Sequence, residues 1–394
     1  MPYNSAFENF NKIRKKELKT YFPETVGMMA QMEEWQEFRQ AVQQEMMRPR
    51  SALFYINEIE DIAKVMVHKI NEKKDDKGDL NTARICQEYA LESINVIFLG
   101  SKVGVLEGSA EGSAMINNTE IIIKEIEKMS YYPNQLLGYE FNWYKRLVQA
   151  NKDLMEVNNK HIKESMRDLD LENSERILAK HVRNCGKEST IPQIIAADAL
   201  FAGINTAAVT LNLLLYNLAS NQEVQEKLYN EIYATIGTDG DITEANVKRM
   251  PYLKACHQES QRMLPIIMGT MRKTQVDMVL RGYHIPAGTN VGRMGYFNSM
   301  HEMNFPEPDK FLPERWIRGC PTRHSADPFS NLPFGHGPRA CVGQRFALLE
   351  IQVAVAKIIQ SYRLNYTGND ISMIKDQFLA TPSEAIMINY SDRN

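Results

Sequence analysis

The sequence 333-PFGHGPRACVGQRFALLE-350 decides the fold, because it places a single cysteine just before a helical pattern. Gly335 and Gly337 precede Cys341, and Gly343 follows it. A thiol in a loop this rich in glycine has four interpretations. It can be half of a disulfide, a catalytic nucleophile, part of a phosphate-binding loop, or a metal ligand.

Three of these interpretations lack the partners that they need. The five cysteines are scattered and never form a CxxC pair, which argues against a disulfide framework or structural zinc and favours a reducing compartment. No histidine has a spacing that nominates it as the base for a nucleophile. GHGPRA fits the dinucleotide pattern GxGxxA only formally, since Pro338 interrupts it, and the chain has no GK[ST] motif.

A metal ligand fits the loop better. The dipole of the following helix favours a thiolate, and the glycines let the backbone approach a flat cofactor closely. Arg339 could pair with a carboxylate of that cofactor, and Phe334 could shield the sulfur. A single cysteine suits a metal whose other positions are already filled, as in haem. On the loop alone, an inert buried cysteine remains the competing interpretation.

The composition is that of an ordinary globular protein, with 394 residues, 43% hydrophobic and 24% charged, and a net charge of −3. This charge gives no attraction to nucleic acid. No stretch has the uninterrupted apolar length of a membrane span, because three asparagines break the richest one. The N-terminus reads as neither a signal peptide nor a transit peptide.

Helical periodicity dominates the first three quarters of the chain, and short β-like runs appear only after Pro265. The most apolar segment, 191–219, predicts a central buried helix, whereas 151–170 and 174–184 read as surface helices. We therefore expect one domain, 1–394, that is mainly α with small β-sheets (α+β). Helices are expected at residues 50–70, 82–99, 151–170, 174–184, 191–219, 222–237 and 344–362.

Two further groups of residues are unremarkable when each is taken alone. Glu259 and Arg262 are three residues apart on one helix face and can form an ion pair, and Arg315 lies in the loop PERW. Trp35 and Arg39 are four residues apart and can both point at one anion. An exposed, salt-bridged surface explains both groups equally well.

The segment FAGINT lies inside the predicted central helix. Gly203 lowers helix stability there, and Asn205 and Thr206 put polar groups on an apolar helix. One interpretation is a widened groove that holds oxygen and water beside a metal. The other is a packing glycine with polar neighbours that bond back to the helix.

Together, and in this order, these motifs resemble the cytochrome P450 family of haem-thiolate monooxygenases, over Met1 to Tyr390. The resemblance implies haem b, bound between the central long helix and the helix after Cys341. Cys341 is then the axial ligand of the iron. The motifs are WxxxR (Trp35, Arg39), AGxxT (Ala202, Gly203, Thr206), ExxR (Glu259, Arg262), the loop with Arg315, and FxxGxRxCxG (Phe334, Gly337, Arg339, Cys341, Gly343).

The resemblance also implies roles for the other residues. Trp35, Arg39, Arg272 and Arg339 match positions that bind the haem propionates. Glu259, Arg262 and Arg315 match a buried structural network, in which the charges must be fully paired. Thr206 matches the distal threonine that helps to deliver protons.

This chain departs from the family pattern in two places. Most members carry an acid before the distal threonine, where this chain has Asn205, and an amide cannot exchange a proton as a carboxylate does. The family also carries an anchoring or targeting segment, a helix and two strands before the point that matches Met1. We expect residues 1–394 to lack them, which would leave an open sheet edge.

Three segments (48–55, 280–291 and 346–366) resemble the animal mitochondrial type, which takes electrons from a ferredoxin. Lys254 and Arg345 match basic positions that face this partner; a second interface lysine is replaced by Gln258. Two solvated basic residues, or a diflavin reductase as donor, remain alternatives. The resemblance implies the matrix side of the mitochondrial inner membrane, with peripheral membrane contact of the full-length form.

The resemblance predicts a monooxygenase that inserts one atom of O2 into a lipophilic substrate, such as a sterol, secosteroid or xenobiotic. Its electrons would come ultimately from NADPH. Asn205 and the expected missing strands motivate one alternative, a haem-binding sensor or a degenerate pseudoenzyme. A haem-thiolate isomerase is another. Retention of Thr206 favours oxygen activation.

Overall fold

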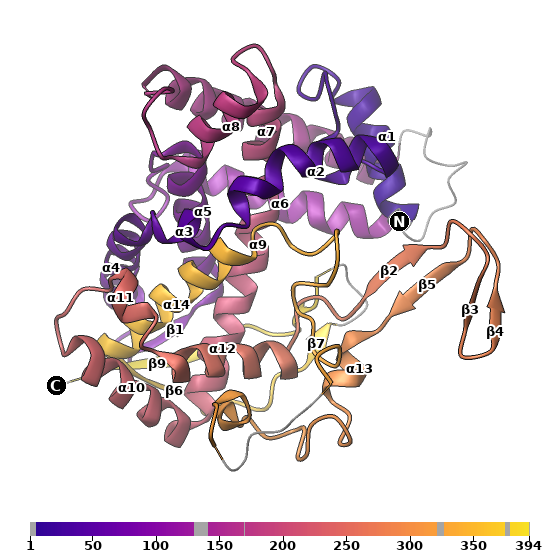
Figure 1. The fold of residues 1–394 in the computed structure, drawn as a ribbon. Helices are drawn as coiled ribbons and strands as arrows, with labels where there is room; N and C mark the ends of the chain where they lie inside the picture. Colours follow the sequence, from indigo (N-terminus) through magenta and orange to yellow (C-terminus); the bar gives the residue numbers. More distant parts are fainter. Residues whose placement is uncertain (1–4, 130–140, 169, 321–326, 375–378, 394) are drawn as a thin grey trace.

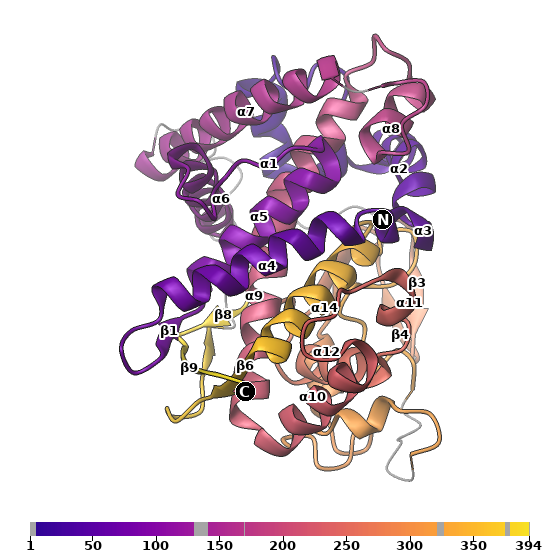
Figure 2. The ribbon, with the colours of Figure 1, turned by 90° about the vertical axis from the view of Figure 1, so that its left-hand side faces the viewer.

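The computed structural model describes residues 5–129, 141–168, 170–320, 327–374 and 379–393. Over these residues the chain forms a body of helices with small antiparallel sheets at its edges (Figure 1, Figure 2). The predicted mainly α fold with small β-sheets is confirmed.

The helices, in chain order, begin and end as follows. They are α1 (Ser5–Glu17), η1 (Gly27–Met29), α2 (Met32–Met46), α3 (Pro49–Leu53), α4 (Ile56–Lys73), α5 (Ala83–Leu99), α6 (Ala110–Met129), α7 (Asn142–Asp168), α8 (Ile177–Cys185), α9 (Ile191–Ser220), α10 (Gln222–Ile236), α11 (Glu244–Val247), α12 (Pro251–Met263), α13 (Gly295–Ser299), η3 (Pro313–Trp316) and α14 (Gln344–Ser361).

The strands are short and pair antiparallel. β9 lies between β1 and β6, with Leu80 opposite Ile388 and Leu364 opposite Tyr390. Three two-stranded pairs complete the described sheets: β2–β5, β3–β4 and β7–β8. The bounds are β1 (Asp79–Asn81), β2 (Thr270–Lys273), β3 (Met278–Leu280), β4 (Tyr283–Ile285), β5 (Asn290–Arg293), β6 (Tyr362–Asn365), β7 (Met373–Ile374), β8 (Thr381–Pro382) and β9 (Met387–Asp392).

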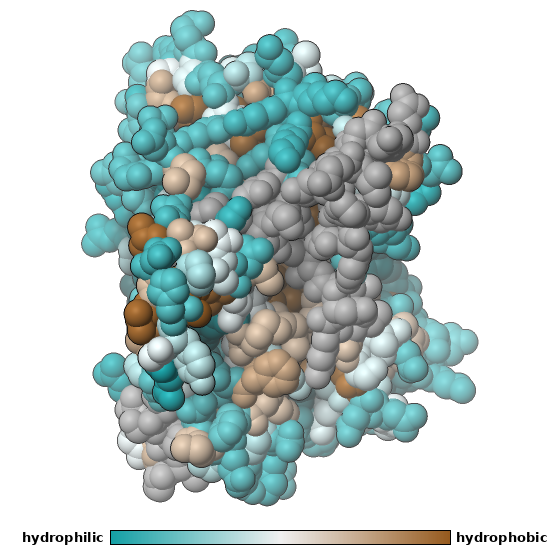
Figure 3. All heavy atoms as spheres, turned by 90° about the vertical axis from the view of Figure 1, so that its right-hand side faces the viewer, coloured by the Kyte–Doolittle hydropathy of each residue, from teal (hydrophilic) through white to brown (hydrophobic). Residues whose placement is uncertain are grey.

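Residues 270–293, which we call the β-arm, extend from the helical body as the β2–β5 pair, which carries the β3–β4 hairpin at its outer end (Figure 1). Hydrophobic side chains on the β-arm are open to solvent, with Val276, Val279 and Tyr283 between 66% and 75% exposed. Figure 3 views the molecule from the side on which the β-arm lies in Figure 1. On this face, brown hydrophobic residues stand out against a largely hydrophilic surface. The β-arm therefore contributes little to the core.

Helix α9 is the centre of the fold, because most side chains along its 30 residues are apolar and buried. A helix that is hydrophobic on all sides is stable only when other elements cover it. α5 packs along α9, and a Cβ on Gly203 would lie 2.9 Å from Ile94 Cδ1. Among the described helices, α9 alone is long and apolar enough to cross a membrane, but 72% of its apolar window is buried inside the protein.

Most of the predicted helices occur, with ends that differ by a few residues. Gly100 and Gly237, both at φ 70°, end α5 and α10 as their positions predict. The predicted helix 50–70 is divided into α3 and α4 near Tyr55. Thr82 precedes α5, but its hydroxyl donates to Asn212 of α9 instead of capping the helix.

The predicted surface helix 174–184 occurs as α8. Five of its nine residues are buried, including Ile177 and Val182. The helix packs against both α2 and α9, so its apolar face lies in the interior. Lys180 and Arg183 lie at less buried positions, as expected for a surface helix with one apolar stripe.

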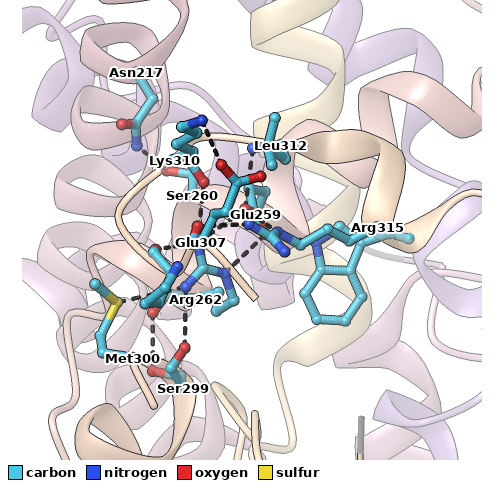
Figure 4. A network of polar contacts seen from close by, with 12 residues as sticks. Asn217, Glu259, Ser260, Arg262, Ser299, Met300, Glu307, Lys310, Leu312 and Arg315 are labelled. Carbon is cyan, nitrogen blue, oxygen red and sulfur yellow. Dashed lines mark hydrogen bonds and ion pairs between the residues drawn. The ribbon is translucent and has the colours of Figure 1, made fainter. Parts of the chain in front are cut away.

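The C-terminal half of the fold is held by a carboxylate that is fully removed from water. Arg262 donates to both oxygens of Glu259 at 2.9 Å, and Arg315 Nε donates to one of them at 3.0 Å (Figure 4). Trp316 Nε1 and the Leu312 N–H donate to the same carboxylate, at 2.9 and 3.1 Å. Two cations and two neutral donors thus compensate one buried acid.

The same arginines also bind the loops that follow α12. Arg262 donates to the carbonyl oxygens of Ser299 at 3.0 Å and Pro308 at 2.7 Å, and Arg315 donates to that of Glu307 at 2.7 Å. Glu259 and Arg262 are 0% exposed, so removal of one partner leaves a buried charge without compensation. The network joins α12 to the segment 299–316.

We expect Arg262→Met to lower the free energy of unfolding by about 3–5 kcal/mol, because Glu259 keeps its charge but loses its main partner. Chemical denaturation of the holoprotein measures this loss. Lys227→Met is the matched control, since the ion pair of Lys227 with Glu314 is largely exposed and contributes about 0–1 kcal/mol. Equal losses in the two variants would contradict the assignment.

A second buried titratable group lies on the same helix. His257 is buried, and neither ring nitrogen makes a hydrogen bond to any described residue. Burial lowers the pKa of His257 from 6.5 to about 4, because the charged imidazolium would lose its water. The folded protein therefore holds this imidazole neutral at pH values where the unfolded chain protonates it.

This difference in pKa predicts a loss of stability in acid. The folded pKa lies below the unfolded value, so stability is complete above about pH 6.5 and falls by about 3 kcal/mol by pH 4. His257→Leu removes this titrating group and should reduce the slope of the unfolding free energy against pH between 7 and 4. Leu253→Met, a buried change on the same helix that removes no titrating group, should leave the slope unchanged. An unchanged slope in His257→Leu would contradict the prediction.

Candidate active site

The loop before α14 is closed by its own backbone. The Cys341 N–H donates to the carbonyl of Phe334 at 2.8 Å, and the Ala340 N–H donates to that of Gly337 at 2.9 Å. Gly335 and Gly337 both have φ near 75°, a region that side chains with a Cβ rarely adopt. The two glycines thus let the loop turn back and present Cys341 just before the helix.

The Cys341 thiol is accessible, although protein surrounds it on most sides. Burial raises the pKa of Cys341, while the Gly343 N–H, the Arg39 guanidinium and the Gln344 N–H oppose that rise. The N–H groups at the start of α14 therefore act toward the thiolate, as the sequence predicts, but burial outweighs them. A bound metal ion would lower the pKa of the Cys341 thiol, because a thiol that coordinates a metal is deprotonated.

Helix α2 reaches the cysteine loop through a stacked pair. The guanidinium of Arg339 lies 3.8 Å from the centre of the Trp35 ring, and it donates to the carbonyl of Ala30 at 3.3 and 3.4 Å. Trp35 is buried, and it packs with Val26 and Ala30 in a small apolar cluster. The exposed surface pair that the sequence also allowed is not what forms.

Arg39, one turn after Trp35, is also buried, and it is close enough to Cys341 to lower the pKa of the thiol. Its Nε donates to Gln43 at 3.3 Å. The structure therefore brings Trp35, Arg39, Arg339 and Cys341 into one region. Arg272 lies on β2, half-buried, with Nη1 donating to the carbonyl of Met271 at 2.8 Å, so its part in haem binding stays a prediction.

The face of α9 around Thr206 is the accessible part of an otherwise buried helix. Ala202 is exposed and Thr206 is half-buried, and the Thr206 hydroxyl donates to the Ala202 carbonyl at 2.7 Å. Gly203 packs against Ile94 of α5, which favours the packing interpretation of this glycine. Asn205 is buried and bonds to side chains of α5 and α6. Catalytic roles for these residues stay predictions.

Sequence reasoning missed an ion pair beside this face. Arg14 Nη1 donates to Asp198 Oδ1 at 2.7 Å, with both side chains at most 4% exposed, and the Met28 N–H donates to the other oxygen at 2.7 Å. A Cβ on Gly27 would lie 2.1 Å from Asp198 Oδ2, so this position requires glycine. The available signal was that Asp198 is the only charged residue of α9.

The two predicted redox-partner residues are both on the surface. Lys254 lies on α12 and Arg345 on α14, and each is exposed. The two helices pack against one another, so both basic groups belong to neighbouring elements. The arrangement allows one acidic partner to approach both.

Comparison with known proteins decides what this site belongs to. The sequence model of the family described as Cytochrome P450 matches residues 3–389, nearly the whole chain. The chain belongs to the cytochrome P450 family. This P450 is therefore a monooxygenase, with haem b as its cofactor, O2 as its co-substrate and electrons that come ultimately from NADPH.

Curated relatives agree with the predicted branch. The chain is 31% identical to "Probable cytochrome P450 49a1" of Drosophila melanogaster, over 94% of this chain and 66% of that protein. It is 27% identical to "Probable cytochrome P450 12a5, mitochondrial" of the same species, over 95% and 74%. It is 26% identical to "Cytochrome P450 CYP12A2" of Musca domestica, over 99% and 78%. The resemblance to the mitochondrial type is confirmed.

The residues present fit haem b. An accessible thiol and an accessible face on α9 suit the two sides of a flat, apolar ring. The positive charges of Arg39 and Arg339 suit carboxylate groups at its edge. Cys341 would hold the iron, and α9 would cover the other face. The accessible thiol, the α9 face and the two arginines together make up this fit.

The geometry predicts a task for each side chain of the candidate site. Haem b, ligated by a thiolate, supplies the oxygen activation that monooxygenation requires. The Trp35 ring keeps the Arg339 guanidinium in one plane, and Arg39 adds positive charge near the sulfur. The Thr206 hydroxyl gives its proton to Ala202, so Thr206 Oγ1 is left to accept a hydrogen bond from a water molecule.

We expect Cys341→Ala to lose the red-shifted Soret band that thiolate-ligated haem shows when it is reduced under carbon monoxide. The absorption spectrum of the purified holoprotein measures this. Cys185→Ala, at a half-buried position on α8, should keep the band. A band that persists in Cys341→Ala, or that disappears equally in both variants, would contradict the assignment of the ligand.

Proposed function

We propose that this P450 inserts one oxygen atom into a lipophilic substrate, with electrons supplied by a ferredoxin in mitochondria. The observation that carries the proposal is the backbone-closed loop that presents an accessible Cys341 beside Arg39. Retention of Thr206 on the accessible face of α9 supports oxygen activation. Several relatives are named as mitochondrial, which supports the compartment.

The chemistry of the α9 face supports a lipophilic substrate. Its accessible or half-buried positions Ala199, Ala202, Thr206 and Val209 carry no charge. An ionic group placed against them would lose its water without gaining a partner. Sterols, secosteroids and apolar xenobiotics meet this condition. The exposed apolar side chains of the β-arm support a peripheral membrane contact, from which such molecules can be taken.

The position of Lys254 and Arg345 supports a ferredoxin as the electron donor. Both cations are exposed on packed neighbouring helices, and α14 begins three residues after Cys341. An acidic partner docked on them would approach the proximal end of the cysteine loop. Charge pairs of this kind act mainly on the rate of association and weaken with salt.

We expect the double variant Lys254→Glu and Arg345→Glu to slow haem reduction by ferredoxin at least tenfold at low salt. Stopped-flow spectroscopy with ferredoxin, its reductase and NADPH measures the rate. Lys163→Glu, an exposed change on α7, is the control. Reduction by dithionite should be equal in all variants. Reduction by a diflavin reductase but not by ferredoxin would overturn the choice of partner.

Product analysis with a panel of sterols, secosteroids and apolar xenobiotics tests the reaction itself. Hydroxylated or epoxidised product supports the proposal. Haem reduction without any product would favour the haem-binding sensor. Conversion that needs no external electrons would favour the isomerase.

A further inference from the structure

Four polar side chains form a closed ring around the turn of α9 that carries Thr206. Gln87 of α5 donates from Nε2 to Glu120 of α6, and also to Asn205 Oδ1 of α9 at 3.2 Å. Asn205 Nδ2 donates to Thr119 Oγ1 of α6 at 3.1 Å. Because Thr119 and Glu120 are consecutive residues of α6, the chain of hydrogen bonds both begins and ends on that helix. Three helices are thereby joined at one point.

The direction of these hydrogen bonds requires an amide at position 205. Gln87 uses both protons of its amide nitrogen, on Glu120 and on Asn205. The Thr119 hydroxyl gives its proton to the Ile116 carbonyl at 2.7 Å, so its oxygen accepts from Asn205. A carboxylate at 205 would have no proton to give to Thr119. It would also add negative charge to a ring that already contains Glu120.

The ring is buried at Asn205 and Thr119, so its hydrogen bonds there matter for stability. Asn205 is 5% exposed and Thr119 is 0% exposed, whereas Glu120 reaches the surface. A buried amide that loses its partners is destabilising, so α9 is held in the position that satisfies it. Thr206 is the next residue along α9, and its hydroxyl bonds within the same turn, to Ala202. The ring therefore fixes the backbone from which the Thr206 side chain extends.

We propose that Gln87, Thr119 and Glu120 are positioning residues that act through Asn205 on the Thr206 turn. In this assignment, which rests on the proposed function, Asn205 anchors the distal helix and is not a proton donor. In place of the acid that most family members carry at this position, this chain has an uncharged amide held by hydrogen bonds to Gln87 and Thr119. Glu120 serves as a hydrogen-bond acceptor, so its charge is dispensable while its oxygen is not.

The first experiment removes the ring without touching Thr206. Gln87→Met deletes both donors, and we expect a shifted C–O stretching frequency in the reduced carbon monoxide complex. We also expect a several-fold larger fraction of NADPH oxidised with release of hydrogen peroxide. The control is Asn117→Ala, which removes the neighbouring α5–α6 hydrogen bond from Arg84 at 3.1 Å without contacting α9. Equal behaviour of Gln87→Met and Asn117→Ala would overturn the proposal.

The second experiment separates positioning from proton transfer. Glu120→Gln keeps an acceptor oxygen, so the stretching frequency and the peroxide fraction should match the wild type, whereas Glu120→Ala should match Gln87→Met. Loss of product formation in Glu120→Gln would assign proton transfer to Glu120 and overturn the proposal.

Asn205→Asp tests the anchor itself. We expect a lower melting temperature and no gain in product per NADPH, because the carboxylate cannot donate to Thr119. A gain in product at unchanged stability would overturn the proposal. The stretching frequency requires only reduced haem and carbon monoxide, so it tests the ring even if no substrate is ever turned over. Failure of the proposed function is thus distinguishable from failure of this inference.

Discussion

A carboxylate can remain in a protein interior only when opposite charge and donors surround it, and Glu259 is the case on which this fold depends. Arg262 and Arg315 neutralise it, and they use their remaining N–H groups to hold the carbonyls of the segment 299–316. Residues 300–312, between α13 and η3, contain no helix or strand. Their position is therefore set by charge pairing at α12, more than by apolar packing.

The two sides of the site are built by different means. The proximal side is local, since ten consecutive residues form a loop whose turns and closing hydrogen bond lie within it. The distal side is assembled from remote segments. α9 is mostly apolar, and two of its buried polar groups, Asp198 and Asn205, are satisfied by side chains far away in the chain. The structure of the distal side therefore depends on how the other helices pack against α9.

This contrast explains what could be predicted from the sequence. The cysteine loop was recognisable because glycine, arginine and cysteine must stand at fixed spacings for the loop to form. α9 was predicted from composition alone, and its neighbours α5 and α10 from periodicity with glycine ends. The partner of Asp198 and the ring around Asn205 were not predictable, because hydrogen-bond partners 86 to 184 residues away leave no local pattern.

The short segment Val26–Ala30 has a consequence for how the cofactor enters. Its Met28 N–H is fixed to Asp198 on the distal helix, and two residues later the Ala30 carbonyl is fixed to Arg339 on the cysteine loop. One stretch of backbone thus spans both walls between which a flat ring would lie. For haem to enter or leave along this edge, one of these two hydrogen-bonded contacts, at Met28 or at Ala30, must break. We therefore expect this segment to slow haem exchange, whatever the strength of the bond between iron and sulfur.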